Sequence, residues 1–379
     1  MLVNHTNKKK TTLMLSATMM MAMILSACGG STPAAPKTEG ATQAPASNAV
    51  GAQFNGSGST FVQPLFEDWA FAYKQLDGTV SINYSGGGSG QGKKDIIAGT
   101  VDFAGSDSKL TDEEFGKKPM QHIPMVAGAI VLAYNIEGVT SQIVLDNQAV
   151  GDIYVGKIEK WSDAAIAKLN PDVKFPDIPI NVVHRSDGSG TTNIFTLFLT
   201  AASENWKGAV TPSAGTTVDW PVDKLKRGQG GKGNQGVAAA VQKTNGAIGY
   251  VELSYAKNNK MAYAKQVNAA GKIIDATPES VTEAMKDAQL SERLTADIVN
   301  SKQDAAWPIA GIAYTILNKD YPDCAKAEKL LKFWNWALTD ADAKARAAKQ
   351  LYASLPDAVS AKAMDALKGI TCQGKAVLK

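Results

Sequence analysis

The amino-acid sequence predicts an α/β protein of two to three domains. Its 379 residues are 44% hydrophobic and 20% charged, which is the composition of an ordinary globular protein. At roughly 150 residues per domain, this length corresponds to two or three domains. Along the chain, a strand-like stretch, a glycine-rich turn and a helix-like stretch follow one another repeatedly. This alternation is typical of α/β proteins, whose ligand sites lie outside the strand ends.

The first 27 residues have the features of a secretory signal. Three lysines at 8–10 precede an apolar run at 13–25. This run of about 13 residues is too short to span a bilayer as a helix, which takes about 20. It ends in Leu-Ser-Ala-Cys (25–28), which resembles the lipobox of bacterial lipoproteins. We therefore expect residues 1–27 to be a lipoprotein signal peptide and Cys28 to be lipidated after cleavage.

The net charge of the mature chain argues against one class of function. The formal net charge of +3 comes from 39 basic and 36 acidic residues. The signal peptide holds three lysines and no acidic residue, so the mature chain has 36 of each and is formally neutral. Neutrality argues against a nucleic-acid-binding protein. Residues 28–53 are rich in Gly, Ser, Thr, Pro, Ala and Gln and predict a flexible tether, so the folded body is expected to begin near Phe54.

Cys324 and Cys372 are the two other cysteines of the chain. An even pair in an exported protein is more often a disulfide than two free thiols, so we expect a structural bridge, with free thiols as the alternative. His122 and His184 are the only histidines of the mature chain, and no Cys or His spacing suits zinc or iron. No metal site and no cofactor is therefore expected.

Four glycine-rich clusters punctuate the folded body. They lie at 56–58, 86–92, 188–190 and 228–236. Hydrophobic spacing between them predicts helices at 62–76, 93–97 and 193–200 and strands at 80–84 and 178–184. The glycine-rich turns thus stand between the end of a strand and the start of a helix.

Hydroxyl side chains at these turns suit an oxyanion. Thr60, Ser89 and the stretch 189–191 each stand near the start of a helix, where N–H groups lack intrahelical partners and carry partial positive charge. The alternative is that each hydroxyl only caps its own helix. Arg185 has a planar guanidinium that suits bidentate contact with phosphate-like oxygens, and Asp187 would hold it in place. Together these turns favour an anion site.

Asp107 is the residue that would discriminate among anions. A carboxylate beside an anion site is repulsive unless the ligand brings a proton. Hydrogenphosphate has one and sulfate at neutral pH has none. An ionised Asp107 that accepts this O–H would therefore favour phosphate and reject sulfate through an unpaired, like-charge contact. The alternative is an aspartate in a surface turn.

The segments around these residues resemble a known family. Gly-Ser-Gly-Ser-Thr-Phe (56–61), Gly-Gly-Gly-Ser (86–89), residues 96–107 and Arg-Ser-Asp-Gly-Ser-Gly-Thr (185–191) carry the resemblance. They are similar to the periplasmic phosphate-binding protein of the bacterial high-affinity phosphate ABC importer. Further similar segments are 230–236, 246–252 and 307–309, so the resemblance covers nearly everything after residue 54.

The resemblance implies a ligand set and a fold. The implied phosphate ligands are Thr60, Phe61, Ser89, Asp107, Arg185, Ser189, Gly190 and Thr191. Asp107 would accept the ligand's proton and Asp187 would pair with Arg185. The implied fold is the two-lobed periplasmic-binding-protein fold of type II, with two α/β domains joined by two crossovers and the ligand in the cleft. Residues 54–133 and 305–379 would form one lobe, and residues 134–304 the other.

The expected function is high-affinity binding of inorganic phosphate outside the cytoplasmic membrane and its delivery to the permease subunits of an ABC importer. A monomer, held at the membrane only by lipidated Cys28, is implied. The alternatives are a binder of sulfate or molybdate and an extracytoplasmic phosphatase. Two enzyme motifs are incomplete. Gly87–Lys93 has the spacing of a P-loop, but Lys94 follows where a P-loop has Ser or Thr. Ser106-x-x-Lys109 matches the serine motif of penicillin-binding enzymes, but their Lys-Thr-Gly motif is missing. We expect no enzyme.

Overall fold

The computed structural model describes residues 51–378. The expected signal peptide, Cys28 and nearly all of the expected tether lie outside the described residues. Within the described residues, no helix combines the length and the apolar character that a membrane crossing takes. The first strand begins at Ala52, because Ala52 already pairs with Val80, so the last residues of the expected tether belong to the sheet.

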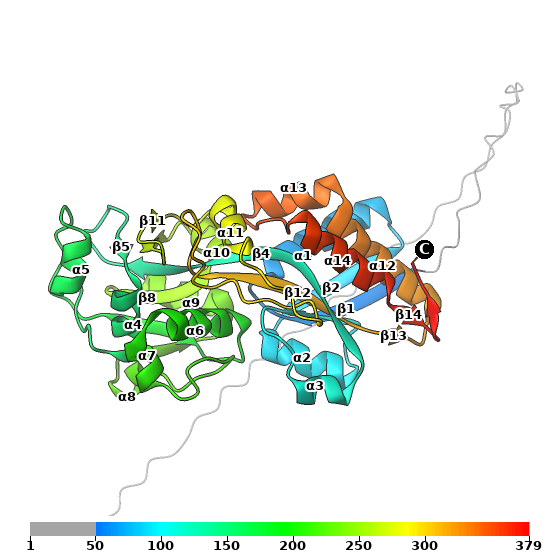
Figure 1. Cartoon of the computed structure of the whole chain (residues 1–379), viewed down its shortest axis with the longest axis horizontal. Helices are drawn as coiled ribbons and strands as arrows, with labels where there is room; N and C mark the ends of the chain where they lie inside the picture. The colour runs from blue at the N-terminus through cyan, green and yellow to red at the C-terminus, as the bar shows by residue number, and fades with distance from the viewer. Residues whose placement is uncertain (1–50, 379) are drawn as a thin grey trace, which may run out of the picture. The chain divides into compact units, whose positions relative to one another are not determined.

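A nine-stranded mixed sheet forms the centre of the molecule (Figure 1). Its order is β2-β1-β3-β12-β4-β8-β6-β7, and β9 also pairs with β4. The strands are β1 (Ala52–Gly58), β2 (Val80–Gly86), β3 (Phe103–Ser106), β4 (Met120–Asn135), β6 (Asn181–Arg185), β7 (Gly228–Gly231), β8 (Ala247–Glu252), β9 (Ala262–Tyr263) and β12 (Ala310–Asn318). β1 is parallel to β2 and β3, and β6 is parallel to β7 and β8.

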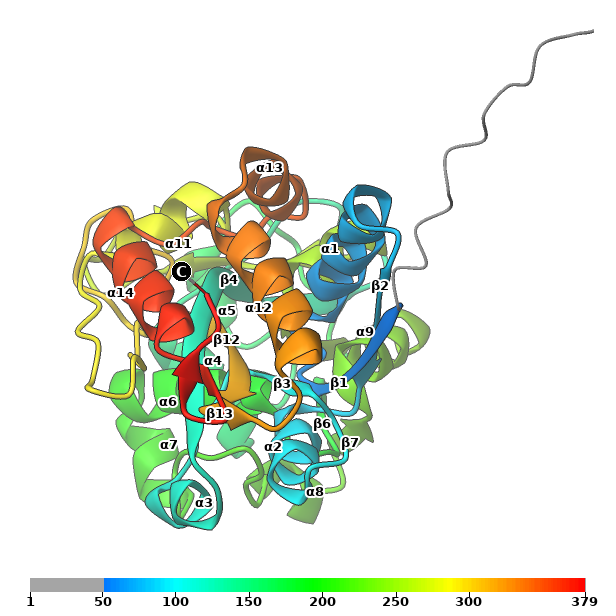
Figure 2. The ribbon, with the colours of Figure 1, turned by 90° about the vertical axis from the view of Figure 1, so that its right-hand side faces the viewer.

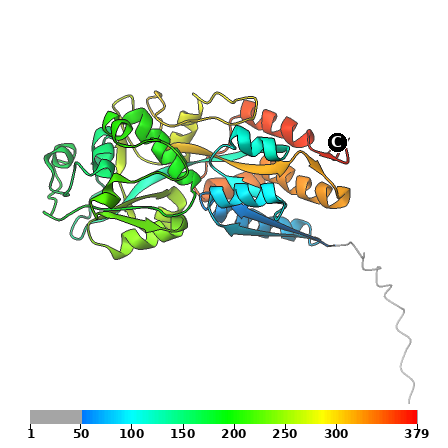
Figure 3. The same cartoon turned by 90° about the horizontal axis from the view of Figure 1, so that it is seen from below.

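β4 connects the two halves of this sheet. Its residues from Met120 to Ala129 pair with β12, and those from Ile130 to Asn135 pair with β8, both antiparallel. Almost all of β4 is buried, because it lies in the middle of the sheet and its stretch at 125–134 is apolar. We call the part with β1, β2, β3 and β12 the first lobe, and the part with β6, β7 and β8 the second lobe. Figure 3 shows the two lobes side by side, with the green elements in the second.

Helices cover both halves of the sheet. The first lobe carries α1 (Gln63–Leu76), α2 (Ser89–Ala98), α3 (Asp112–Lys117), α12 (Cys324–Thr339), α13 (Ala341–Lys349) and α14 (Asp357–Lys368). The other helices are α4 (Asn147–Val155), α5 (Ala164–Leu169), α6 (Gly190–Ala202), α7 (Glu204–Ala209), α8 (Pro221–Lys224), α9 (Gly233–Lys243), α10 (Leu253–Asn258) and α11 (Pro278–Met285). Figure 2 shows α12 beside α14.

Two three-stranded sheets lie outside the central one. One contains β5 (Val144–Leu145), β10 (Lys265–Val267) and β11 (Ile273–Ile274). The other contains β13 (Asp320–Tyr321), β14 (Thr371–Cys372) and β15 (Lys375–Ala376). Cys324 and Cys372 form a disulfide, with Cα atoms 5.3 Å apart, that ties the start of α12 to β14. This bridge joins two C-terminal elements of the first lobe.

The predicted helices and strands are present with shifted bounds. The helix expected at 62–76 is α1, which has a proline in its first turn and buries an apolar face. The helices expected at 93–97 and 193–200 begin earlier, at Ser89 and Gly190. Glycine and threonine have low helix propensities, so the first turns Ser-Gly-Gln-Gly of α2 and Gly-Thr-Thr-Asn of α6 resemble loops in sequence. The earlier starts place hydroxyl residues inside the first turns of α2 and α6.

Candidate anion-binding site

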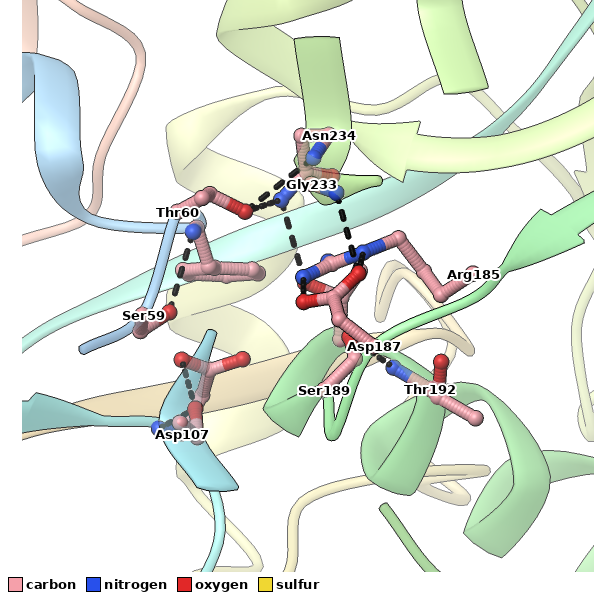
Figure 4. Close-up of polar contacts among 12 residues, drawn as sticks. Ser59, Thr60, Asp107, Arg185, Asp187, Ser189, Thr192, Gly233 and Asn234 are labelled. Atoms are coloured by element: carbon pink, nitrogen blue, oxygen red, sulfur yellow. Dashed lines mark hydrogen bonds and ion pairs between the residues drawn. The ribbon is translucent and has the colours of Figure 1, made fainter. Parts of the chain in front are cut away.

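The candidate site forms where strands end and helices begin. Thr60 follows β1, Asp107 follows β3 and Arg185 ends β6. Ser89 opens α2 after β2, and Asn234 lies in the first turn of α9 after β7. Because β1, β2 and β3 run parallel, as do β6 and β7, their carboxyl ends bring these residues to one edge of each sheet half. Figure 4 shows that residues from both lobes meet there.

Thr60 and Phe61 form the first group of the site. The Thr60 hydroxyl oxygen accepts hydrogen bonds from the backbone N–H of Asn234 at 3.1 Å and from its side-chain Nδ2 at 2.9 Å. The Thr60 carbonyl accepts one from the Tyr255 hydroxyl at 2.6 Å. The backbone N–H of Phe61 donates to the Ser59 hydroxyl at 2.9 Å. Lobe-two side chains therefore hold the loop that follows β1.

Asp107 and Ser89 form the second group. The Ser89 hydroxyl donates to Asp107 Oδ1 at 3.1 Å, and the Asp107 backbone N–H approaches Ser89 Oγ at 3.2 Å. Both residues are buried. The other carboxylate oxygen, Oδ2, is buried and takes no hydrogen bond from any residue between 51 and 378. This oxygen is an unsatisfied acceptor, so a ligand with an O–H group could satisfy it.

The charge of Asp107 follows from its surroundings. Burial raises the pKa of Asp107 to about 6, although the nearby hydroxyls of Ser59 and Ser89 and the positive charge of Arg185 oppose the rise. At pH 7 a carboxyl with this pKa is ionised in roughly nine molecules of ten. Asp107 is therefore a hydrogen-bond acceptor at neutral pH and becomes a donor as the pH falls below about 6.

Arg185 and Asp187 form a bidentate ion pair. The guanidinium donates from Nε to Asp187 Oδ1 at 2.8 Å and from Nη2 to Oδ2 at 2.5 Å. Asp187 Oδ1 also accepts the backbone N–H of Gly233 at 3.0 Å. Burial opposes the ionisation of Asp187, but the hydrogen bonds and charge of Arg185 lower its pKa overall. Nη1 of Arg185 donates to the Thr191 hydroxyl at 3.3 Å. The guanidinium is therefore fixed in one orientation.

Ser189, Gly190 and Thr191 start helix α6. Ser189 is its N-cap, and the Ser189 hydroxyl accepts the Thr192 N–H at 3.0 Å. A Cβ atom at Gly190 would collide with the Asp107 carboxylate and the Ser89 hydroxyl, so only glycine fits here. Ser189 alone among the predicted hydroxyls caps its own helix: the N-caps of α1 and α2 are Val62 and Gly88, without side-chain caps. The capping alternative is therefore wrong for Thr60 and Ser89.

The structure brings the predicted residues together across the two lobes. Asn234 links Thr60 of the first lobe to Thr191 of the second, because its Nδ2 group donates to both hydroxyls, and the Thr191 hydroxyl also accepts a hydrogen bond from Arg185. Ser89 and Asp107 of the first lobe lie against Gly190 of the second. The backbone N–H of Gly90 donates to the carbonyl of Gly188 at 2.9 Å, a further contact between the two lobes beside the site.

Some residues at the site were not predicted from sequence. They are Ser59, Asn234, Glu252 and Tyr255, all of which bond to the predicted residues or to one another. Asn234 lies within the glycine-rich cluster at 228–236, which was recognised, but its contact with Thr60 spans 174 residues. Within residues 51–378, no three His, Cys, Asp or Glu side chains are grouped as a metal site.

The sequence of this chain is similar to those of known proteins. Residues 43–341 match the model of the PBP superfamily domain. The phosphate-binding protein PstS of Xylella fastidiosa (strain 9a5c) is 38% identical over 296 residues, which are 77% of this chain and 79% of that protein. PstS of Pasteurella multocida (strain Pm70) is 38% identical over 309 residues, which are 80% of this chain and 86% of that protein.

Solved structures have the same fold. A human phosphate binding apolipoprotein superposes with a TM-score of 0.68 at 22% identity and covers 86% of this chain and 100% of its own. A putative phosphate ABC transporter substrate-binding protein with bound phosphate from Clostridium perfringens gives 0.58 at 23% identity and covers 80% and 100%. These likenesses confirm the predicted α/β, two-lobed periplasmic-binding-protein fold. The chain belongs to the PBP superfamily and, within it, to the family of the phosphate-binding proteins PstS.

Proposed function

We propose that this protein binds inorganic phosphate with high affinity outside the cytoplasmic membrane and delivers it to an ABC-type phosphate importer. The curated relatives are named phosphate-binding proteins, and one solved relative of the same fold contains bound phosphate. The observation that carries the proposal is the buried Asp107 Oδ2, an acceptor that no residue between 51 and 378 satisfies. Hydrogenphosphate is an anion that brings a proton for this oxygen.

The proposed ligand set places donors around the anion and one acceptor at its proton. The ligands are Thr60, Phe61, Ser89, Asp107, Arg185, Ser189, Gly190 and Thr191. The guanidinium of Arg185 supplies the positive charge, and its ion pair with Asp187 keeps the guanidinium in position. Hydroxyl and backbone N–H groups supply the remaining donors, which suits the four oxygens of a tetrahedral anion.

Discrimination follows from the ionisation of Asp107. At neutral pH its carboxylate accepts a hydrogen bond but cannot donate one, because burial raises its pKa only to about 6. Hydrogenphosphate donates to it, whereas sulfate offers only negative oxygens and leaves a like-charge, unpaired contact. Sites that hydrogen-bond a substrate O–H can bind analogues without this group about 10⁴-fold more weakly. Sulfate and molybdate binding are therefore disfavoured.

We propose residues 54–133 with 305–379 as one lobe and residues 134–304 as the other. The change of partner along β4 at Ala129 and Ile130 supports a boundary near this point. Phosphate would contact both lobes and so favour the closed form, which the permease would recognise. We further propose a monomer, held at the membrane through lipidated Cys28, that acts as a binding protein and not as an enzyme.

Isothermal titration calorimetry on the purified, phosphate-stripped protein tests this function. At pH 7.5 we expect one phosphate per chain, with sulfate and molybdate at least about 1,000-fold weaker. A parallel assay with a chromogenic phosphate ester should release no product. Equal binding of sulfate and phosphate, or no binding of phosphate, would overturn the proposal, and phosphate release from the ester would overturn the exclusion of an enzyme.

A further inference from the structure

Asn234 stands between the two lobes at the centre of the site. It lies in the first turn of α9, its side chain is completely buried, and Figure 4 shows it directly beside Thr60. Its Nδ2 group donates to the hydroxyl of Thr60 in the first lobe at 2.9 Å. The same group donates to the hydroxyl of Thr191 in the second lobe at 3.2 Å. One amide therefore contacts two of the proposed phosphate ligands.

The orientation of this amide is fixed. Asn234 Oδ1 accepts the backbone N–H of Glu252 at 2.9 Å. A backbone N–H can only donate, so the oxygen of the amide must face Glu252 and the NH₂ group must face the two threonines. Because every hydrogen-bonding group of this side chain has a partner, it cannot turn without leaving one of them unsatisfied in a buried place.

The hydroxyl of Thr60 is thereby left with one role. Its oxygen accepts both the backbone N–H of Asn234 at 3.1 Å and the side-chain Nδ2 at 2.9 Å. A hydroxyl has two acceptor positions and one donor proton. With both acceptor positions occupied, the Thr60 hydroxyl can no longer accept a hydrogen bond and can only donate one. Its proton is therefore available to another acceptor, such as a ligand oxygen.

The hydroxyl of Thr191 is held in the same way. Its oxygen accepts from Asn234 Nδ2 at 3.2 Å and from Arg185 Nη1 at 3.3 Å. Both of its acceptor positions are again taken by groups that can only donate. A hydroxyl fixed as a donor discriminates in favour of an anion, since it cannot rotate to accept from a neutral ligand.

We propose that Asn234 is a positioning residue that makes the hydroxyls of Thr60 and Thr191 obligatory donors to the bound anion, and that it fixes the hydroxyl of Thr60 only when the lobes are closed. The inference rests on the proposed phosphate-binding function and adds a residue to it. Since Thr60 belongs to the first lobe and Asn234 to the second, both bonds to Thr60 exist only in the closed arrangement. Closure therefore completes the donor set.

Asn234→Asp tests the inference with little change of shape. The carboxylate keeps the size of the amide but cannot donate, so it accepts from both threonine hydroxyls and turns their protons away from the ligand. Gln235→Glu is the matched control, because it adds the same charge at the neighbouring, exposed position of α9. Phosphate affinity is measured by calorimetry at pH 7.5, and thermal melting checks that each variant is folded.

We expect Asn234→Asp to weaken phosphate binding by at least about 100-fold and Gln235→Glu by less than about 3-fold. A double-mutant cycle with Thr60→Val and Asn234→Ala separates positioning from a structural role. If Asn234 acts through the Thr60 hydroxyl, the combined loss should fall at least about 10-fold short of the product of the single losses.

The outcomes separate this inference from the proposed function. If the wild-type protein and Gln235→Glu bind phosphate tightly and Asn234→Asp binds equally well, only the role of Asn234 is overturned. Purely multiplicative losses in the cycle would also overturn it. If the wild-type protein does not bind phosphate, the proposed function fails and the inference fails with it.

Discussion

Glu252 is a buried carboxyl at the junction of the lobes, and the loss of its proton should make the protein less stable as the pH rises. Oε2 accepts the backbone N–H of Ser254 at 2.9 Å, the hydroxyl of Ser254, and the hydroxyl of Tyr352 at 3.4 Å. Oε1 has no hydrogen-bond partner among the described residues. Burial raises the pKa of Glu252 to about 8, and the hydrogen bonds from Ser254 and Tyr352 offset only part of this rise.

The size of the effect follows from the two pKa values. The carboxyl has a pKa of 4.5 when unfolded and about 8 when folded, so between these values the folded protein keeps a proton that the unfolded chain releases. The contribution of the protonated Glu252 carboxyl to the free energy of unfolding is therefore fully present below pH 4.5. It is lost as the pH rises to about 8. At about 1.4 kcal/mol per pKa unit, the total loss is about 5 kcal/mol.

Urea denaturation of wild-type protein and Glu252→Gln from pH 5 to pH 9 measures this loss. The glutamine side chain of the variant cannot titrate, and all other groups contribute equally to both proteins, so the difference between their unfolding free energies isolates Glu252. We expect the unfolding free energy of the wild type to fall by about 4 kcal/mol relative to that of Glu252→Gln as the pH rises over this range. A difference that stays constant with pH would refute the raised pKa and the burial argument behind it.

Three further changes test separate parts of the structure. Replacing Cys324 and Cys372 together by serine should lower the unfolding free energy by about 4 kcal/mol, because the unfolded chain regains the entropy of a long open loop; unchanged urea denaturation would contradict this. Arg185→Lys loses the bidentate pair with Asp187, so calorimetry should show phosphate binding weakened by about 100-fold, whereas retained affinity would argue against a fixed guanidinium. Gly190→Ala places a methyl group against two site side chains and should weaken phosphate binding by at least about 10-fold, while a wild-type affinity would exclude the close approach.

The local parts of the fold could be predicted from the sequence. The apolar spacing of residues 62–76 predicted helix α1 almost to the residue, since one buried face has the period of a helix. The starts of α2 at Ser89 and α6 at Gly190 were missed, because their first turns, Ser-Gly-Gln-Gly and Gly-Thr-Thr-Asn, contain no apolar residue that would show that spacing. The change of partner along β4 at Ala129 was also not predicted, since the apolar stretch at 125–134 says nothing about which strands lie beside it.

The site likewise contains residues that the sequence predicted and residues that depend on tertiary contacts. The positions of Asp107 and Arg185 after strands could be read from motifs and from the family resemblance, and the structure brings both to one place. Asn234 could not be predicted, because its contact with Thr60 joins residues 174 positions apart and depends on how the lobes close. The unsatisfied Oδ2 of Asp107 is likewise a product of tertiary burial, which no local pattern encodes.

The most direct test of the account is the selectivity between phosphate and sulfate in wild-type protein and in Asp107→Asn, measured by calorimetry at pH 7.5 and pH 5. Asp304→Asn is the matched control, because it removes an exposed carboxylate. At pH 7.5 the wild type should prefer phosphate by at least about 1,000-fold, and Asp107→Asn should lose at least about 100-fold of this preference.

At pH 5 the wild-type preference should fall, because Asp107, with a pKa of about 6, is then mostly protonated and can donate to sulfate. Asp304→Asn should behave as the wild type at both pH values. If Asp107→Asn keeps the full preference for phosphate at pH 7.5, the claim that an ionised Asp107 selects the ligand by accepting its proton is contradicted.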